Sequence, residues 1–167
     1  MLFKINNDAV IRSAGPEDSE LIHSLIYELA VYEKMTEQVT GTPEDTRRTL
    51  FEQNMAEVII CEYKGEPAGF ALFFHNYSTF LAKSGLYLED LFIKPEFRRK
   101  GLGKAMLSFL AKIAVERGCG RFEWSCLDWN EPSINFYKSL GAIAMDSWTV
   151  YRLTGDKLTD LAEKFKS

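Results

Sequence analysis

Three consecutive cations stand directly before two glycines in the stretch RRKGLG, residues 98–103. Apolar residues follow at 102, 105, 106, 109, 110, 113 and 114, and this spacing predicts an amphipathic helix that begins within the motif. The first turn of a helix carries unpaired backbone N–H groups and the positive end of the helix dipole. Because glycines let these groups converge and Arg and Lys add charge, the stretch predicts a phosphate or pyrophosphate site.

Two common phosphate-binding motifs do not fit this stretch. A P-loop needs four residues between its glycines and then Lys-Ser/Thr, whereas one residue separates the glycines here and Ala105 follows Lys104. A dinucleotide fingerprint needs a third glycine at the position of Met106. A third phosphate-binding pattern, Arg-x-x-Gly-x-Gly/Ala, matches residues 98–103 at every position. Because it is short, a solvated basic turn before a core helix explains it equally well.

Two acidic residues, Glu89 and Asp90, interrupt the apolar stretch GLYLEDLFIKP, residues 85–95. A carboxylate inside an apolar strand is costly unless it is used or paired, which makes the pair a candidate for acid–base chemistry. Strand alternation predicts that the two side chains face opposite sides of the sheet, so that only one of them can face a substrate. The alternative is an ordinary charge on an edge strand.

The cysteines and histidines indicate no nucleophile and no metal site. Cys126 lies in a predicted apolar strand without a helix N-terminus or a histidine to lower its pKa, which is typical of an inert core cysteine. His23 and His75 have no partner at ligand spacing, and the three cysteines form no CxxC pair. We therefore expect no metal cofactor and a reducing, cytoplasmic compartment.

The elements around these motifs alternate between strands and helices. Helices are predicted from Pro16 to Leu29, over 42–53, 101–117 and 131–140, and at the polar C-terminus; strands are predicted over 9–13, 57–63, 68–74, 85–95, 121–127 and 148–153. The second and third strands flank a turn and should form a hairpin, and the strand–helix–strand from 86 to 127 should be a parallel, right-handed crossover. This order predicts an α/β fold with an antiparallel front half.

The bulk composition limits the class of protein. The chain has 167 residues, a net charge of −4 and 46% hydrophobic residues, which predicts one soluble domain over 1–167. The acidic balance argues against a nucleic-acid partner and favours a small cationic substrate. Because no secretory signal opens the sequence and no apolar run approaches about 18 residues, we expect no membrane partner.

Three further stretches carry a resemblance to a known family: ELAVYEKMTEQV (28–39), YLEDLFIKPEFR (87–98) and DWNEPSINFYKSLGA (128–142). With them, the chain resembles the GNAT superfamily of acetyl-CoA-dependent N-acetyltransferases over roughly residues 9 to 165. It is most similar to the diamine branch, which includes spermidine/spermine and thialysine N-acetyltransferases. Arg99 stands where many relatives have glycine, and NYSTF (76–80) resembles the thialysine-type members more than the spermidine-type.

The resemblance implies a fold, two substrates and a mechanism. The fold is a GNAT-type mixed, mostly antiparallel sheet with a parallel strand–helix–strand crossover and helices on both faces. Acetyl-CoA is the co-substrate, and the acceptor is a primary amine of a small cationic metabolite, which is a diamine, a polyamine or a thialysine-like amino acid. The amine attacks directly in a ternary complex. The resemblance also implies a homodimer.

The resemblance assigns roles to individual residues. An amine with a pKa near 10.4 is protonated at neutral pH and needs a base, and Glu89 is the residue implied to contact and deprotonate it. Tyr137 is implied to protonate the leaving thiolate, although a half-buried helix tyrosine is the plain alternative. The implied amine contacts are Tyr32, Glu33 and Glu89. The implied acetyl-CoA contacts are Leu91, Phe92, Ile93, Arg98, Arg99, Lys100, Gly101, Leu102, Gly103, Lys104, Asn130 and Ser133.

Two other functions are compatible with part of the pattern. A non-catalytic acetyl-CoA-binding or regulatory module on the same fold would bind the cofactor without turnover, and the presence of both Glu89 and Tyr137 argues against it. A nucleotide-binding module would bind ATP or NAD, and the missing Lys-Ser/Thr and third glycine argue against that function. The sequence does not specify the amine.

Overall fold

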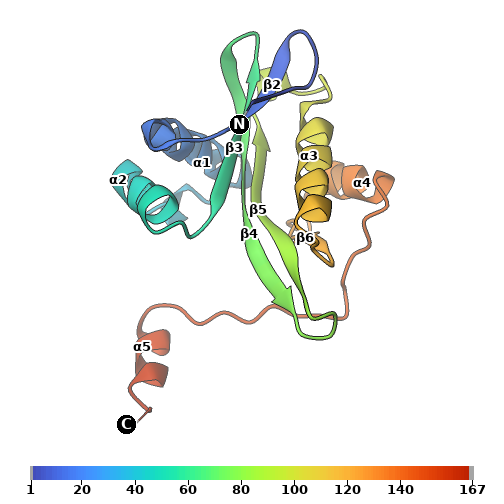
Figure 1. Cartoon of the computed structure of the whole chain (residues 1–167). Helices are drawn as coiled ribbons and strands as arrows, with labels where there is room; N and C mark the ends of the chain where they lie inside the picture. The colour runs from blue at the N-terminus through green and yellow to red at the C-terminus, as the bar shows by residue number, and fades with distance from the viewer. Residues whose placement is uncertain (1, 166–167) are drawn as a thin grey trace. The chain divides into compact units, whose positions relative to one another are not determined.

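The computed structural model describes residues 2–165, which divide into two compact units, one ending at Ser125 and one beginning at Cys126. Within the described residues, the first unit contains a six-stranded sheet in the order β1-β2-β3-β4-β5-β6 (Figure 1). Its strands are β1 (Leu2–Lys4), β2 (Ala9–Ser13), β3 (Glu57–Tyr63), β4 (Glu66–Ser78), β5 (Lys83–Ile93) and β6 (Phe122–Trp124).

Neighbouring strands run antiparallel except β5 and β6, which pair in parallel from Leu86 opposite Phe122 to Leu88 opposite Trp124. The predicted β3–β4 hairpin, the mostly antiparallel sheet and the parallel pairing of the crossover are therefore confirmed. The short strand β1 was not predicted.

Helices cover both faces of this sheet (Figure 1). One face carries α1 (Ser19–Glu33) and α2 (Pro43–Arg47), which a π-helical turn extends to Glu52, and the other carries α3 (Leu102–Glu116). A capping box begins α2: the N–H of Asp45 donates to the Thr42 hydroxyl at 3.1 Å, and the Asp45 carboxylate accepts from the N–H of Thr42 at 3.1 Å.

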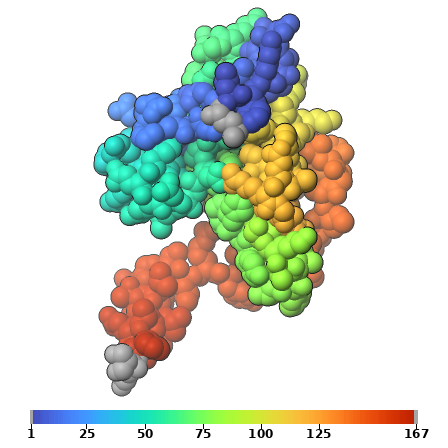
Figure 2. All heavy atoms as spheres, viewed as in Figure 1, coloured from blue at the N-terminus to red at the C-terminus, as the bar shows by residue number. Residues whose placement is uncertain are grey.

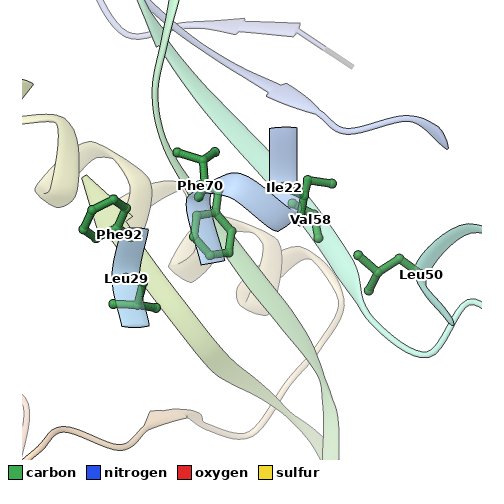
Figure 3. Close-up of a cluster of buried hydrophobic side chains, with 7 residues drawn as sticks. Ile22, Leu29, Leu50, Val58, Phe70 and Phe92 are labelled. Carbon is green, nitrogen blue, oxygen red and sulfur yellow. The ribbon is translucent and has the colours of Figure 1, made fainter. Parts of the chain in front are cut away.

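The core lies where these helices pack on the sheet. Ile22 and Leu25 of α1 and Phe70 of β4 are completely buried, and they join the cluster drawn in Figure 3. On the other face, Met106 and Leu110 of α3 are completely buried. Burying each such side chain contributes about 1.5–3 kcal/mol relative to leaving it exposed. This packing fixes both α1 and α3 on the sheet.

A partly buried ion pair fixes the start of α1. The Arg12 guanidinium of β2 donates to both carboxylate oxygens of Asp18, at 2.7 and 2.8 Å, and its Nε donates to Glu62 of β3 at 2.6 Å. The N–H of Gly15 also donates to Asp18, at 2.9 Å. These hydrogen bonds, that from Arg12 first, hold the pKa of Asp18 below its usual range. The helix is therefore tied to two strands where it begins.

The second unit contains α4 (Glu131–Ser139) and α5 (Asp156–Ala162). The strand predicted over 148–153 is wrong, because these residues form no ladder. Their aromatic and β-branched residues suit a strand, but a strand needs a hydrogen-bonded neighbour, and this segment has none among the described residues. Figure 2 draws its atoms in orange-red, and Trp148 and Tyr151 are 73% and 91% exposed. The single domain over 1–167 stays a prediction.

Candidate active site

The cationic motif forms the loop that leads into α3. Gly101 occupies the N-cap position of the helix with φ 77° and ψ 2°, and Arg99 has φ 62°. Both values lie in the left-handed region, which costs a residue other than glycine about 1–2 kcal/mol. Glycine would adopt the conformation at position 99 without this cost. Arg99 adds charge to the loop at the cost of backbone strain.

The first turn of α3 presents uncapped backbone N–H groups. The N–H of Ala105 donates to the carbonyl of Gly101 at 3.0 Å, so the amides of residues 102–104 precede the intrahelical ladder. No side chain caps this helix, and its first turn contains no acidic residue within the part of the chain that the structure describes. Together with the exposed residues Arg99 and Lys100, these amides fit a diphosphate group.

The loop packs closely against the end of β5. A Cβ atom built at Gly103 would lie 3.9 Å from the Cγ1 atom of Ile93, with no other atom of the described chain within 4 Å. The space therefore accepts either glycine or alanine, as the motif allows. The hydrogen bond from Arg98 Nε to the carbonyl of Ile93, at 3.0 Å, joins the predicted pyrophosphate loop to the strand predicted to run beside acetyl-CoA.

The last residues of β5 pair on one side only. Leu91, Phe92 and Ile93 lie opposite Ala71, Phe70 and Gly69 of β4. On the other side the pairing with β6 ends at Leu88, so residues 91–93 have no strand neighbour there within residues 2–165. An open strand edge of this kind is what the predicted contact with the pantetheine amides or an oxyanion requires, and that contact stays a prediction.

A β-bulge in β5 changes the predicted geometry of the two acids. Asp90 lies opposite Leu72 of β4, but the next residue of β4, Phe73, lies opposite Leu88. Glu89 is therefore an extra residue in the ladder, so the unbroken ladder that the alternation argument assumed is absent at this point. That Glu89 and Asp90 face opposite sides of the sheet stays a prediction. Glu89 is exposed, whereas Asp90 is mostly shielded from solvent.

The charges of Glu33 and Glu89 act on the carboxylate of Asp90 at this bulge. The pKa of Asp90 is raised to about 6, first by burial and then by the charges of Glu89 and Glu33. Burial also raises the pKa of Glu33, the last residue of α1. The cluster formed by Glu33, Glu89 and Asp90 is thus negative and partly desolvated, and it favours a bound cation. The sequence made Glu89 and Asp90 a candidate pair, and the resemblance then favoured Glu33 and Glu89. The raised pKa of Asp90 depends on its burial, which the sequence does not show.

Two residues predicted to bind different substrates are in contact. The guanidinium of Arg98, predicted to bind acetyl-CoA, lies 4.7 Å from the centroid of the Tyr32 ring, predicted to contact the amine. The neighbouring Lys100 places its Nζ 5.1 Å from the centroid of Tyr63. The first unit therefore brings together the cationic loop, the open edge of β5, the end of α1 and the acidic cluster.

The remaining predicted residues lie in the second unit. Asn130 is buried at the start of α4, and its side-chain oxygen accepts from the N–H of Ser133 at 3.4 Å. Tyr137 lies in the same helix and is half-buried, with its ring 5.6 Å from that of Phe136. The contacts of Asn130 and Ser133 with acetyl-CoA, and the acid role of Tyr137, stay predictions.

Cys61 is a poor candidate for a nucleophile. Burial raises the pKa of the Cys61 thiol to about 11, which disfavours a thiolate. Residues 2–165 contain no cluster of three or more His, Cys, Asp or Glu side chains arranged to hold a metal ion. No helix in the same range is long and apolar enough to cross a membrane.

One cavity lies apart from the candidate site. Its volume is about 420 Å³, and it opens between the start of β3 and the C-terminal half of α3. Its lining includes Phe73, Phe109 and the ion pair of Glu57 with Arg117, and none of the predicted site residues.

Comparison with known sequences identifies close relatives. The model of the acetyltransferase (GNAT) family matches residues 24–142. The chain is 36% identical to an L-ornithine N5-acetyltransferase of Arabidopsis thaliana over 89% of this chain and 85% of that protein. It is 34% identical to a thialysine N-epsilon-acetyltransferase of Sus scrofa over 93% of this chain and 98% of that protein.

Comparison with solved structures supports the fold. An integron cassette protein from the mobile metagenome of V. cholerae superposes with a TM-score of 0.81 at 24% identity, over 95% of this chain and 99% of that one. At this identity, the likeness is evidence for the fold alone.

Proposed function

Because the chain belongs to the GNAT family of acetyltransferases, we propose that this N-acetyltransferase transfers the acetyl group of acetyl-CoA to the primary amine of a small cationic metabolite. The single observation that carries the proposal is the acidic cluster of Glu33, Glu89 and Asp90. It lies partly on β5, the strand that leads into the uncapped, cationic start of α3. The cationic start of α3 suits the anionic diphosphate of acetyl-CoA, and the acidic cluster suits the cationic amine.

Residues of the first unit would hold acetyl-CoA, which supplies an acetyl group activated as a thioester. The amides of residues 102–104 and the cations of the loop would bind its diphosphate. The open edge of residues 91–93 would donate to its pantetheine amides or to its carbonyl oxygen. Asn130 and Ser133 of α4 are proposed as further contacts.

The acidic cluster would bind the amine and help to remove its proton. An amine with a pKa near 10.4 loses its proton at pH 7 at a cost of roughly 4 to 5 kcal/mol, at about 1.36 kcal/mol per pH unit. Exposed Glu89 would pass the proton to solvent, while Asp90 and Glu33 provide negative charge for the cation. The cluster thus serves both binding and proton transfer.

We assign Tyr137 as the acid that protonates the departing thiolate. The pKa of a phenol, near 10, suits a thiol with a pKa of about 8.5. The neutral phenol is the form present at pH 7, and it becomes an anion as the proton leaves.

Among the amine classes, we propose the side-chain amine of a small amino acid ahead of a polyamine. The relatives named above carry the names of ornithine and thialysine enzymes, and NYSTF (76–80) resembles the thialysine type.

We further propose a homodimer in the cytoplasm. The exposed apolar side chains of the C-terminal segment, which include Ile143, Trp148, Val150 and Tyr151, support the dimer because such surfaces commonly mark an interface.

The proposal is tested by thiol release from acetyl-CoA with L-ornithine, thialysine, L-lysine, putrescine and spermidine, with mass spectrometry to locate the acetyl group. We expect kcat/KM for an amino acid to exceed that for spermidine at least tenfold, with acetylation at the side-chain amine. If acetyl-CoA binds in calorimetry but no amine of this panel is acetylated, the chain is a non-catalytic binding module. If acetyl-CoA does not bind, the assignment of the loop is wrong.

A further inference from the structure

The segment between β5 and the cationic loop is fastened to α1 at two points. Lys94 places its Nζ 3.6 Å from a carboxylate oxygen of Glu28, and Arg98 places its guanidinium over the ring of Tyr32 at 4.7 Å. Glu28 and Tyr32 are four residues apart, so they occupy one face of the helix. The 3₁₀ turn Pro95–Phe97 separates the two cations, and this turn and its flanking cations therefore follow the last turns of α1.

Arg98 is held from several directions. Its Nε donates to the carbonyl of Ile93 at 3.0 Å, and its guanidinium lies 5.9 Å from the centroid of the buried Phe92 ring. A guanidinium has five donor hydrogens, and the bond to Ile93 uses one of them. The same side chain can therefore bind a phosphate oxygen while it remains stacked on Tyr32.

Arg98 is connected to both proposed sites, the diphosphate site of the loop and the amine site at the acidic cluster. In sequence, it is the first cation of the loop that would bind a diphosphate. In space, it contacts Tyr32, which directly precedes Glu33, and the charge of Glu33 acts on Asp90 in the acidic cluster. Arg98 thus belongs to the proposed anion site and contacts the residue that directly precedes Glu33 of the proposed cation site.

We propose that Arg98 is a positioning residue that couples the two sites, so that coenzyme A and the amine each strengthen the binding of the other. A diphosphate on the loop would restrain Arg98, which would in turn hold Tyr32 and the end of α1 in the arrangement that the amine needs. The second ligand then meets an element that is already ordered, which produces positive coupling that is reciprocal. The inference rests on the proposed function.

Two pairs of variants separate this role from simple packing. Arg98→Lys keeps the charge for phosphate but removes the planar group that stacks on Tyr32. Arg99→Lys is its matched control, because it changes the same chemistry on an exposed neighbour in the same loop. Tyr32→Leu removes the ring from the other side, and Tyr32→Phe retains it. Thermal unfolding shows which variants are folded.

The measurement is the dissociation constant of coenzyme A, by calorimetry, with and without a saturating amine. The probe is the amine of the panel with the highest kcat/KM, and coenzyme A replaces acetyl-CoA so that no reaction occurs. We expect the amine to tighten coenzyme A binding at least fivefold in the unmodified protein, Arg99→Lys and Tyr32→Phe. We expect the amine to tighten coenzyme A binding less than twofold in Arg98→Lys and Tyr32→Leu.

The outcomes distinguish the coupling from the activity. Fivefold coupling in folded Arg98→Lys or Tyr32→Leu, or no coupling in the unmodified protein, overturns the inference while turnover on the panel leaves the proposed function in place. An inactive panel contradicts the proposed function and the inference with it. Loss of coupling in Arg99→Lys as well would show that the loop as a whole, rather than Arg98, carries the effect, and would also overturn the inference.

Discussion

Asp90 shows how a functional position opposes stability at the scale of one residue. Its carboxylate is shielded from water and faces the charges of Glu33 and Glu89, and its pKa of about 6 lies above the ordinary value of 3.8. A negative charge held in this way attracts a cation but destabilises the folded protein when no cation is bound. The sequence identified the acidic dipeptide, but the bulge that shields Asp90 depends on the pairing of β5 with β4 and is visible only in the structure.

Asp90→Asn should therefore stabilise the protein, and more strongly at high pH. Because the folded-state pKa is raised, the stability contributed by this group is present below pH 3.8 and lost as pH rises through about 6. Asparagine does not titrate. We expect the gain in unfolding free energy from Asp90→Asn to be roughly 1 to 1.5 kcal/mol larger at pH 8 than at pH 5, measured by urea denaturation without ligands.

A matched control is Glu96→Gln, which removes one carboxylate from an exposed position. Its effect on stability should change little between the two pH values. An equal gain from Asp90→Asn at pH 5 and pH 8 would contradict a raised pKa. Asp90→Asn should also raise KM for the amine at pH 8, because it removes a charge from the proposed cation site.

At the scale of elements, the features predicted correctly are those whose sequence pattern records burial or local backbone freedom. The apolar stripe of α3 and the apolar run of β3 record burial directly, and both elements form where predicted, over Leu102–Glu116 and Glu57–Tyr63. The anion-binding motif was also visible, because it depends on local backbone freedom. The contact of Arg98 with Tyr32 could not be predicted from the sequence, because it joins residues 66 positions apart and no periodicity records such a contact.

The two glycines of the loop should respond oppositely to alanine. Gly101 has a positive φ and open space around it, so Gly101→Ala adds only backbone strain and should cost about 1 kcal/mol of stability. Gly103 lies inside the first turn of α3 with room for a Cβ atom, so Gly103→Ala should gain about 0.5–1 kcal/mol.

Urea denaturation measures these stabilities, and calorimetry measures the affinity for coenzyme A. Gly101→Ala should weaken that affinity severalfold because strain at position 101 disturbs the neighbouring amides of residues 102–104, whereas Gly103→Ala should change it less than about threefold. The same sign of stability change in both variants would show that the loop conformation differs from the one described.

At the scale of the whole molecule, the segment 148–153 combines a strand-like sequence with exposure to solvent. Its aromatic and β-branched residues are typical of a strand, yet Trp148, Val150 and Tyr151 are all exposed. Soluble monomers rarely leave a contiguous group of large apolar side chains in water. The prediction of a strand was wrong for the isolated chain, and the same pattern supports the proposed homodimer.

Charges placed in this segment should therefore weaken self-association. We expect light scattering after size exclusion to give twice the 19.1 kDa chain mass for the unmodified protein, and a lower mass for the double variant Val150→Lys/Tyr151→Lys, increasingly so on dilution. Burying two cations in an apolar interface is costly, so association should weaken at least tenfold. Phe80→Ser is the matched control, because it removes an exposed aromatic side chain from the turn between β4 and β5 and should leave the mass unchanged. A monomeric unmodified protein would contradict the homodimer, and an undiminished dimer in the double variant would place the interface elsewhere.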